Sequence, residues 1–131
     1  MSRENVEAVQ RGYEHFNRTH TPLYELLDPN AEWHTASDLP DTGTHRGHDG
    51  IAALFSEWVG SFEDFRADVQ ELLDSGEYVV VWCVLRGRAR DSGATVELPE
   101  GHVWKFREGK AVEVREYRSK GEALEAAGIK E

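Results

Sequence analysis

The chain has 131 residues, with 25 acidic and 15 basic side chains and a formal net charge of −10. This charge repels polyphosphate, so we expect no nucleic acid partner, and the longest apolar run, residues 78–85, is too short to span a membrane. A single cysteine, Cys83, excludes an internal disulfide, and no apolar leader precedes the first amphipathic segment. Both features predict a cytoplasmic protein, and the length and lack of a linker predict one domain over residues 1–131.

The first half of the chain has the patterns of helices. Apolar residues from Val6 to Phe16 recur at helical spacing, and Ser2 is the expected N-cap. Thr21 and a proline after it predict a short second helix that ends at Asp28–Pro29. A short strand is expected over residues 31–35 and a loop over 36–47, followed by a third helix from about His48 to residue 60.

The second half changes to the two-residue period of strands. A long strand over residues 65–73 should contain a bulge near Gln70. Residues 78–85 are apolar on both faces, which predicts a central strand covered on both sides. A strand over 95–107, interrupted at 99–101, leads through a tight turn at 108–109 to a last strand over 111–117. Ser119 and Glu122 form a capping box for a short final helix that ends at Gly128.

This order of elements predicts an α+β fold, with helices on a cone-shaped, curved antiparallel sheet. Because the helices are expected on one face only, the other apolar face needs a cover. We therefore expect a homodimer that packs through the outer face of the sheet.

Six segments of the chain carry a family resemblance: residues 13–17 (YEHFN), 26–33 (LLDPNAEW), 46–51 (RGHDGI), 101–106 (GHVWKF), 108–110 (EGK) and 115–117 (REY). They are similar to the nuclear-transport-factor-2-like superfamily, in its SnoaL-like and ketosteroid-isomerase-like branch. The resemblance covers nearly the whole chain. It implies a cystatin-like α+β roll whose mixed sheet wraps around the N-terminal helices and encloses a pocket.

Strand parity selects two polar residues for the interior. Lys105 is charged and should face water, so His102 should face the pocket, and Glu116 should follow the inward valines of the last strand. The resemblance gives both a role. His102 matches a carboxylic acid that donates a hydrogen bond to a substrate oxyanion in the isomerases. Glu116 matches the acidic base of the epoxide hydrolases and SnoaL-like cyclases.

Other positions depart from these relatives. Thr35 stands where the isomerases carry their proton-shuttling aspartate, and Gly12 lies near the position of their oxyanion tyrosine, one residue before Tyr13. No charged pair occupies residues 82–84, where the epoxide hydrolases have one. Neither complete set of catalytic residues is therefore present, so we expect neither a standard ketosteroid isomerase nor a standard epoxide hydrolase.

Each candidate also has a structural interpretation. Glu116 could pair with Arg115, Arg86 or Arg118 at the rim, and His102 could donate to a backbone carbonyl inside the core. Cys83 is expected to be an inert core thiol. The residues expected to line a ligand pocket are Tyr13, Phe16, Trp33, Thr35, Phe55, Trp58, Trp82 and Trp104.

Histidines in and beside the loop are of a residue type that binds transition metals. His34, His45 and His48 lie near Asp38 and Asp41, but no HExxH or cysteine cluster accompanies them, so we expect no metal and no cofactor.

Three functions remain open. The first is a cofactor-independent isomerase, cyclase or dehydratase that moves a proton on a small apolar substrate, with Glu116 as base and His102 as donor. The second is a domain that binds a small apolar molecule without reaction. The third is a dimeric adaptor that works through the outer sheet face.

Overall fold

The computed structural model describes residues 2–36 and 43–129, without the side chain of Ser2. In chain order the elements are α1 (Ser2–Thr19), the 3-10 helix η1 (Tyr24–Leu26), β1 (Leu27–His34), β2 (Thr44–Arg46), α2 (Gly47–Ser61), β3 (Phe62–Ser75), β4 (Tyr78–Ala89), β5 (Thr95–Arg107), β6 (Lys110–Tyr117) and α3 (Lys120–Ala126).

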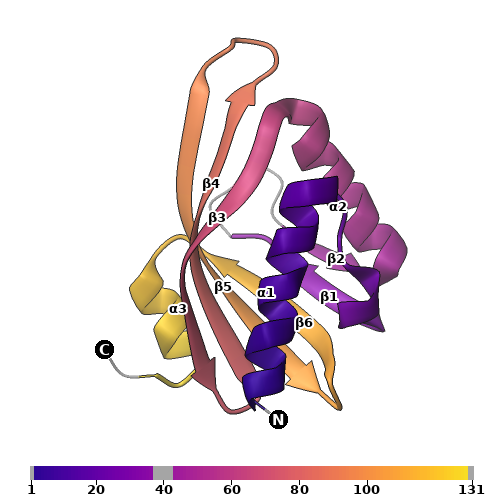
Figure 1. Cartoon of the computed structure of the whole chain (residues 1–131), viewed down its shortest axis with the longest axis vertical. Helices are drawn as coiled ribbons and strands as arrows, with labels where there is room; N and C mark the ends of the chain where they lie inside the picture. Colours follow the sequence, from indigo (N-terminus) through magenta and orange to yellow (C-terminus); the bar gives the residue numbers. More distant parts are fainter. Residues whose placement is uncertain (1, 37–42, 130–131) are drawn as a thin grey trace.

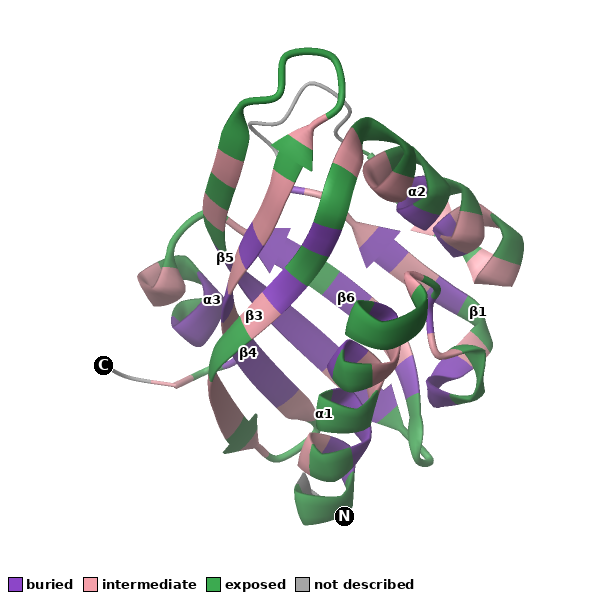
Figure 2. Ribbon diagram, turned by 45° about the horizontal axis from the view of Figure 1, so that its top comes forward, coloured by how far each residue is buried: buried purple, intermediate pink, exposed green. Residues whose placement is uncertain are grey.

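The strands form one curved, open sheet in the order β2-β1-β6-β5-β4-β3. Neighbours are antiparallel except β1 and β6, which are parallel, so the predicted mixed sheet of an α+β fold is confirmed. α1 and α2 lie on the concave face, and α3 packs on the opposite side (Figure 1). Buried positions concentrate between the sheet and the two long helices (Figure 2).

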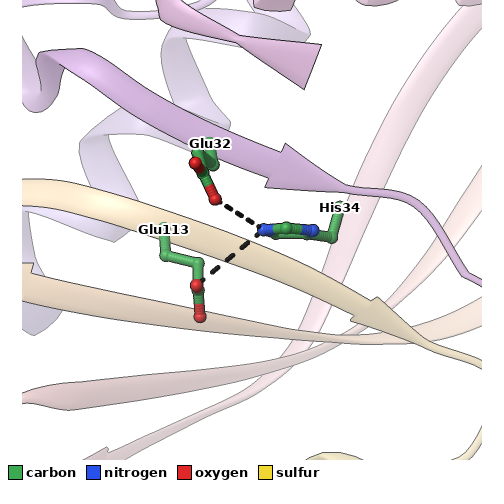
Figure 3. A group of neighbouring side chains, drawn as sticks. All are labelled: Glu32, His34 and Glu113. Carbon is green, nitrogen blue, oxygen red and sulfur yellow. Dashed lines mark hydrogen bonds and ion pairs between the residues drawn. The ribbon is translucent and has the colours of Figure 1, made fainter. Parts of the chain in front are cut away.

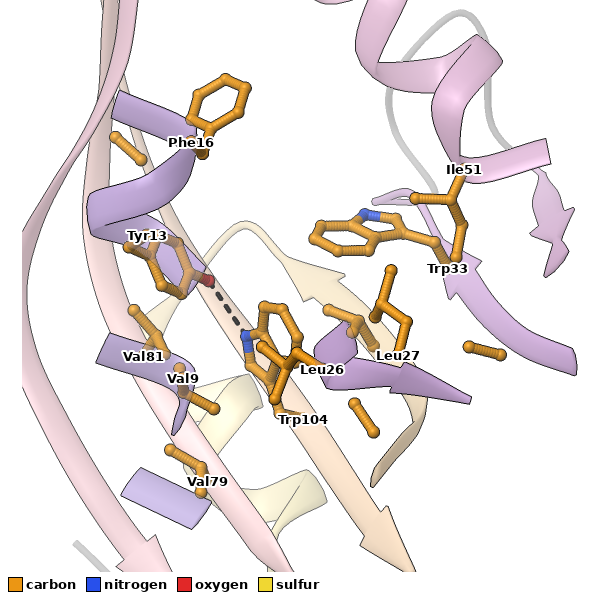
Figure 4. Close-up of a cluster of buried hydrophobic side chains, with 14 of the residues drawn as sticks. Val9, Tyr13, Phe16, Leu26, Leu27, Trp33, Ile51, Val79, Val81 and Trp104 are labelled. Carbon is orange, nitrogen blue, oxygen red and sulfur yellow. Dashed lines mark hydrogen bonds between the residues drawn. The ribbon is translucent and has the colours of Figure 1, made fainter. Parts of the chain in front are cut away.

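The concave side holds the main core. α1 directs Val9, Tyr13 and Phe16 to the sheet, and α2 adds Ile51 and Leu54, all of them buried. Figure 4 shows how these side chains meet those of β1, β4 and β5. Each fully buried apolar side chain contributes about 1.5–3 kcal/mol relative to exposure. The helical spacing of residues 6–16 therefore predicted the face of α1 that the fold buries.

The region after α1 differs from its prediction. Only the single turn η1 is helical, and β1 begins at Leu27, which pairs with Ala111 of β6. Asp28 and Pro29 do not end a helix; they lie inside β1, where the Asp28 side chain accepts the Asn30 N–H at 2.9 Å. The register with β6 shifts between Leu27 and Glu32, so β1 contains a bulge at the Asp28–Pro29 segment. Part of the expected loop is also a strand, β2, paired with the end of β1.

The long strands follow the sequence prediction in part. The predicted bulge at Gln70 is confirmed by the register shift between Val69 and Glu71. The predicted turn at Glu108–Gly109 is also confirmed, with both residues at positive φ. β4 is an interior strand, paired with β3 and β5 and covered on both faces at residues 79–81, although only β3 lies between it and the edge of the sheet.

β5 runs without the interruption that was predicted at residues 99–101. Pro99 pairs with Val84 of β4, while β6 pairs with β5 only from Gly101 onward. The edge of β5 that faces β6 is thus unpaired at Pro99, and a residue without an N–H is tolerated there. As a result Glu100 keeps the regular alternation of a strand.

The outer face of the sheet has a helical cover of its own. Ser119 caps α3 by accepting the Glu122 N–H at 3.1 Å, as predicted. α3 then packs Ala123, Leu124 and Ala127 on Val80 and Val103. The expectation that helices cover only one face is therefore wrong, because α3 covers part of the other.

Candidate functional site

The inner face of β5 carries the polar residues of the site. Glu100, His102 and Trp104 alternate toward the concave side and are all buried. Their partners on β4 are Cys83, Val81 and Val79, whose side chains belong to the same core. Polar groups in such surroundings are costly unless they are hydrogen-bonded, so their partners define the site.

A buried chain of hydrogen bonds connects α1 to β5. The Tyr13 hydroxyl lies 2.6 Å from His102 Nδ1, and His102 Nε2 lies 2.9 Å from Glu100 Oε1. The Trp104 Nε1–H donates to the Tyr13 hydroxyl at 3.0 Å (Figure 4). Because a carboxylate only accepts, His102 Nε2 carries a hydrogen and donates a hydrogen bond to Glu100 Oε1. Both ring nitrogens of His102 are therefore engaged, which leaves no N–H for a ligand.

Glu116 lies directly across from His102 on β6. Its Oε2 accepts the Trp33 Nε1–H at 2.7 Å, and the Ala36 backbone amide also donates to this carboxylate. Two buried oxygens, Glu116 Oε1 and Glu100 Oε2, have no hydrogen-bond partner among the described residues. Glu100, His102 and Glu116 each offer a polar atom, and these atoms lie within 4.8 Å of one another.

The pKa values of the site reflect this burial. Burial and the neighbouring Glu100 carboxylate raise the pKa of Glu116 to about 7, although His102 and the Trp33 N–H favour the ionised form. Burial also raises the pKa of Tyr13. For His102, burial opposes the charged form, but Cys83, Tyr13 and the hydrogen bond to Glu100 together raise its pKa well above the usual value. The pKa of the Glu116 carboxyl is thus shifted toward neutrality.

Two cavities that share a wall border these residues, and Glu116 also lines a third cavity of about 380 Å³ together with Arg115 and Arg118. The narrower of the two that share a wall has a volume of about 40 Å³, close to the size of a water molecule, and His102 lines it with apolar side chains. The larger of these two has a volume of about 260 Å³ and is lined by Glu100 and Glu116. Trp58, Phe65 and Leu85 belong to the walls of both. Glu116 and His102 therefore face neighbouring cavities that share one wall.

The structure distributes the predicted pocket residues between these places. Thr35 lines the larger cavity beside Glu116. Trp82 lies on the outer face, because β4 directs Val81 and Cys83 inward and the residues between them outward. Its assignment to the pocket wall is therefore corrected. The residues found around the narrower cavity are Tyr13, Phe16, Trp33, Phe55, Trp58 and Trp104.

The structure also tests the structural interpretations of Glu116 and His102, and it gives the side chains concerned other partners. Arg115 pairs with Glu113, and Arg86 pairs with Asp68 and Glu97. Glu116 instead lies in the core with 5% of its surface exposed. His102 is bound by side chains on both ring nitrogens and not by the backbone carbonyl that was considered.

The sequence analysis missed Glu100, whose carboxylate accepts the hydrogen bond from His102 Nε2. Its signal was the alternation that already selected His102, extended two residues toward the N-terminus. The neighbouring proline and glycine hid this signal, since such residues usually mark a turn.

A second cluster of the same composition lies on the outer side of the sheet. His34 Nε2 is 3.1 Å from Glu32 Oε1 and 3.8 Å from Glu113 Oε2 (Figure 3). Arg46 pairs with Glu32, and Arg115 pairs with Glu113, so cations already neutralise these carboxylates.

The loop histidines do not converge on one point. His48 donates to the Leu27 carbonyl at 3.1 Å, whereas His34 belongs to the outer cluster. Asp38 and Asp41 lie outside the described residues. Among residues 2–36 and 43–129, the groupings with metal-ligand spacing are Glu32–His34–Glu113 and Glu100–His102–Glu116. No helix of this part of the chain is long and apolar enough to cross a membrane.

Comparison with known proteins identifies the family. The model of the SnoaL-like domain matches residues 9–114, and the chain belongs to this family. No curated protein sequence matches the chain.

Solved structures share the whole architecture. Bal32a, from a soil-derived mobile gene cassette, is 30% identical with a TM-score of 0.75, over 95% of this chain and 96% of its own. An NTF2-like protein of unknown function from Burkholderia pseudomallei K96243 is 28% identical with a TM-score of 0.76, over 93% and 95%. A protein with a cystatin-like fold from Xanthomonas campestris is 20% identical, with a TM-score of 0.71, over 95% and 98%. The predicted family and fold are confirmed.

Proposed function

We propose that the protein is a cofactor-independent proton-transfer enzyme of the isomerase, cyclase or dehydratase type, with Glu116 as the group that takes up and returns the proton. One observation carries this proposal. Glu116 is a buried carboxyl with a pKa raised to about 7, it has one oxygen without a hydrogen-bond partner among residues 2–36 and 43–129, and it lines a cavity large enough for a small ligand. A base whose pKa is near the working pH is the most efficient at general acid–base catalysis.

His102 acts in this proposal through its neighbours. Its Nδ1 and Nε2 are held by Tyr13 and Glu100, so it does not touch the ligand. When the imidazole is charged, both N–H groups donate, and the Tyr13 oxygen then receives hydrogen bonds from His102 and Trp104. The Tyr13 hydroxyl hydrogen is then free to be donated to a ligand oxygen in the narrower cavity.

The walls suggest the kind of substrate. Trp58 and Phe65 form the wall between the two cavities, and a flat apolar body would lie against these rings. The family resemblance implies polyketide cyclases among the relatives of this chain. Their chemistry fits a substrate with an activated carbon–hydrogen bond.

Deuterium exchange tests the proton-transfer function. Small cyclic ketones and phenols that stabilise the protein thermally would be incubated with it in D₂O, and exchange at their activated C–H groups followed by NMR. We expect the wild type to accelerate exchange, and Glu116→Gln to bind the same compounds without doing so. If the wild type binds these compounds without accelerating deuterium exchange, the proton-transfer function is refuted.

That outcome would favour the alternative, a non-catalytic ligand-binding domain. One observation favours this second function: both ring nitrogens of His102 are already engaged, so the imidazole has no N–H to donate to a substrate oxyanion.

We further propose a homodimer through the outer sheet face, in the cytoplasm. Trp82 and Val84 are only half-buried there, beside the exposed Pro99, which supports a contact with a second copy. The buried, unpaired thiol of Cys83 supports a reducing compartment. Sedimentation of the wild type and Trp82→Lys tests the dimer: we expect the variant to be monomeric, and a monomeric wild type would refute it.

A further inference from the structure

The larger cavity is acidic as well as aromatic. Its lining includes the carboxyl groups of Glu57, Glu100 and Glu116, and no lysine, arginine or histidine is among the described residues that line it. The rest of its wall is mostly apolar, contributed by Leu54, Trp58, Phe62, Phe65, Leu85, Val96 and Leu98. This combination differs from the narrower cavity, whose polar groups are hydrogen-bond donors as well as acceptors. A neutral apolar ligand would leave the carboxylates of the larger cavity without partners.

Two of these carboxyl groups are held in the same manner. Glu100 uses Oε1 to bind His102, and Glu116 uses Oε2 to bind Trp33. In each case the other oxygen, Glu100 Oε2 or Glu116 Oε1, is buried and has no hydrogen-bond partner in the described part of the chain. One carboxylate oxygen of Glu100 lies within 4.8 Å of one carboxylate oxygen of Glu116, so the two carboxyl groups are neighbours. A buried acceptor without a partner is costly, so this pair of oxygens is suited to a ligand with two or more donors.

A metal ion fits the pair less well than an organic cation. His102 has no free nitrogen for a metal, which leaves one oxygen from each carboxylate, and the surrounding walls are apolar. An ammonium group has several N–H donors, and the substituent that carries it would lie against Phe62, Phe65 and Trp58. Aromatic faces attract cations, and the net charge of −10 attracts them from a distance.

We propose that the larger cavity binds a small primary amine with an apolar or aromatic substituent, whose ammonium group donates to Glu100 Oε2 and Glu116 Oε1. This inference deepens the proposed function by naming the chemical class of its substrate, and it rests on that function only for the statement that the bound amine reacts. Glu100 is the fixed anchor of the amine, since His102 orients it, and Glu116 is the group that exchanges the proton.

Calorimetry with a matched pair of compounds tests the inference on the wild-type protein. Benzylamine and benzyl alcohol have nearly the same shape, but only the amine is a cation. We expect benzylamine to bind at least about tenfold more tightly, because hydrogen bonds between charged partners are the stronger ones. Equal affinities, or tighter binding of the alcohol, would overturn the proposal without any variant.

Variants then locate the site. Glu100→Gln should remove most of the preference for the amine, and Glu116→Gln should reduce it independently if the first variant does not fold. Glu57→Gln is the control, because Glu57 lines the same cavity but is exposed at its rim. We expect the control to change amine affinity by less than about threefold, in line with a screened surface charge. An equal loss in Glu57→Gln and Glu100→Gln would show a diffuse electrostatic effect and contradict the site.

The binding experiment is separate from the exchange experiment. A preference for the amine without deuterium exchange would support the amine site and refute the proton-transfer function. Deuterium exchange on neutral compounds without a preference for the amine would support the proton-transfer function and refute the amine site.

Discussion

The two faces of the sheet carry the same three side-chain types in two different settings. On the inner face Glu100, His102 and Glu116 come from β5 and β6, and on the outer face Glu32, His34 and Glu113 come from β1 and β6. The inner carboxylates are almost fully buried, and each has one oxygen without a hydrogen-bond partner in the part of the chain that the structure describes. The outer carboxylates have about a third of their side-chain surface exposed, at 32% for Glu32 and 28% for Glu113, and each pairs with an arginine.

This difference shows that the same three side-chain types acquire different electrostatic properties in the two settings. Water and arginine screen the outer cluster, so its charges are already compensated. The inner cluster faces core residues and cavities, where desolvation shifts the proton equilibrium of Glu116 toward neutrality. β6 supplies one glutamate to each cluster, from positions three residues apart that point to opposite faces. Variants of these two glutamates therefore compare the same chemistry in the two environments.

The largest expected effect is on proton transfer. Glu116→Gln should lower the deuterium exchange rate by roughly 10²–10⁴-fold, the usual contribution of a general base. Glu113→Gln, on the same strand but the outer face, should leave the rate within about twofold, since it lies beyond the reach of the cavity. Exchange would be measured by NMR at saturating ligand for both variants. A similar loss in both would mean that the comparison of the two faces carries no functional information.

The next effect is on the pH dependence of stability. The folded state raises the pKa of Glu116 from 4.5 to about 7. Below about pH 4.5 this carboxyl is protonated in both states, and as pH rises toward 7 only the unfolded chain releases its proton freely. The free energy of unfolding should therefore fall over this window by about 3 kcal/mol from this group.

Urea unfolding of matched variants at several pH values measures this contribution. Glu116→Gln should lose less stability than the wild type between about pH 5 and pH 8, because glutamine does not ionise. Glu113→Gln should follow the wild-type curve. Parallel curves for the wild type and Glu116→Gln would contradict the raised pKa.

A smaller effect is expected for the hydrogen-bond chain behind the site. Tyr13→Phe removes the partner of both His102 and Trp104 while it keeps the ring in the core. Leaving two buried polar groups without a partner should cost about 2 kcal/mol of stability. Tyr24→Phe is the control, because Tyr24 is 38% exposed, and it should change stability by less than about 0.5 kcal/mol. Chemical denaturation of both variants distinguishes a buried network from a general loss of a hydroxyl.

Much of the inner face could be predicted because strand parity is a local property. Since the charged Lys105 should face water, strand alternation predicts that His102, Trp104 and Phe106 face inward, and all three are buried. Glu116 followed from its spacing to Val114 in the same way. The prediction did not extend to Val112, because the register of β5 and β6 shifts beside Phe106 and brings Ala111 to the core in its place. A bulge of this kind depends on the partner strand and is not visible in one segment.

The errors arose where local signals met long-range pairing. Asp28–Pro29 and Pro99 resemble chain breaks, yet β6 and β4 provide partners that keep both segments extended. Trp82 was assigned to the pocket for its residue type, although its strand parity with Cys83 sets it on the other face. The cluster on the outer face escaped notice because Glu113 lies far along the chain from His34, and only the parallel pairing of β1 with β6 brings them together.

The smallest expected effect belongs to the outer cluster itself. Glu32→Gln removes a partner of Arg46 and of His34, but these side chains are partly in water, and such pairs contribute about 0–1 kcal/mol. We expect a loss of stability within this range that shrinks further as salt is raised, measured by denaturation at low and high ionic strength. Glu100→Gln, its counterpart at the inner histidine, should cost more and depend little on salt, because its hydrogen bond to His102 is buried. A salt-independent loss at Glu32 as large as that at Glu100 would mean that the outer cluster behaves as a buried one, and the contrast between the two faces would then fail.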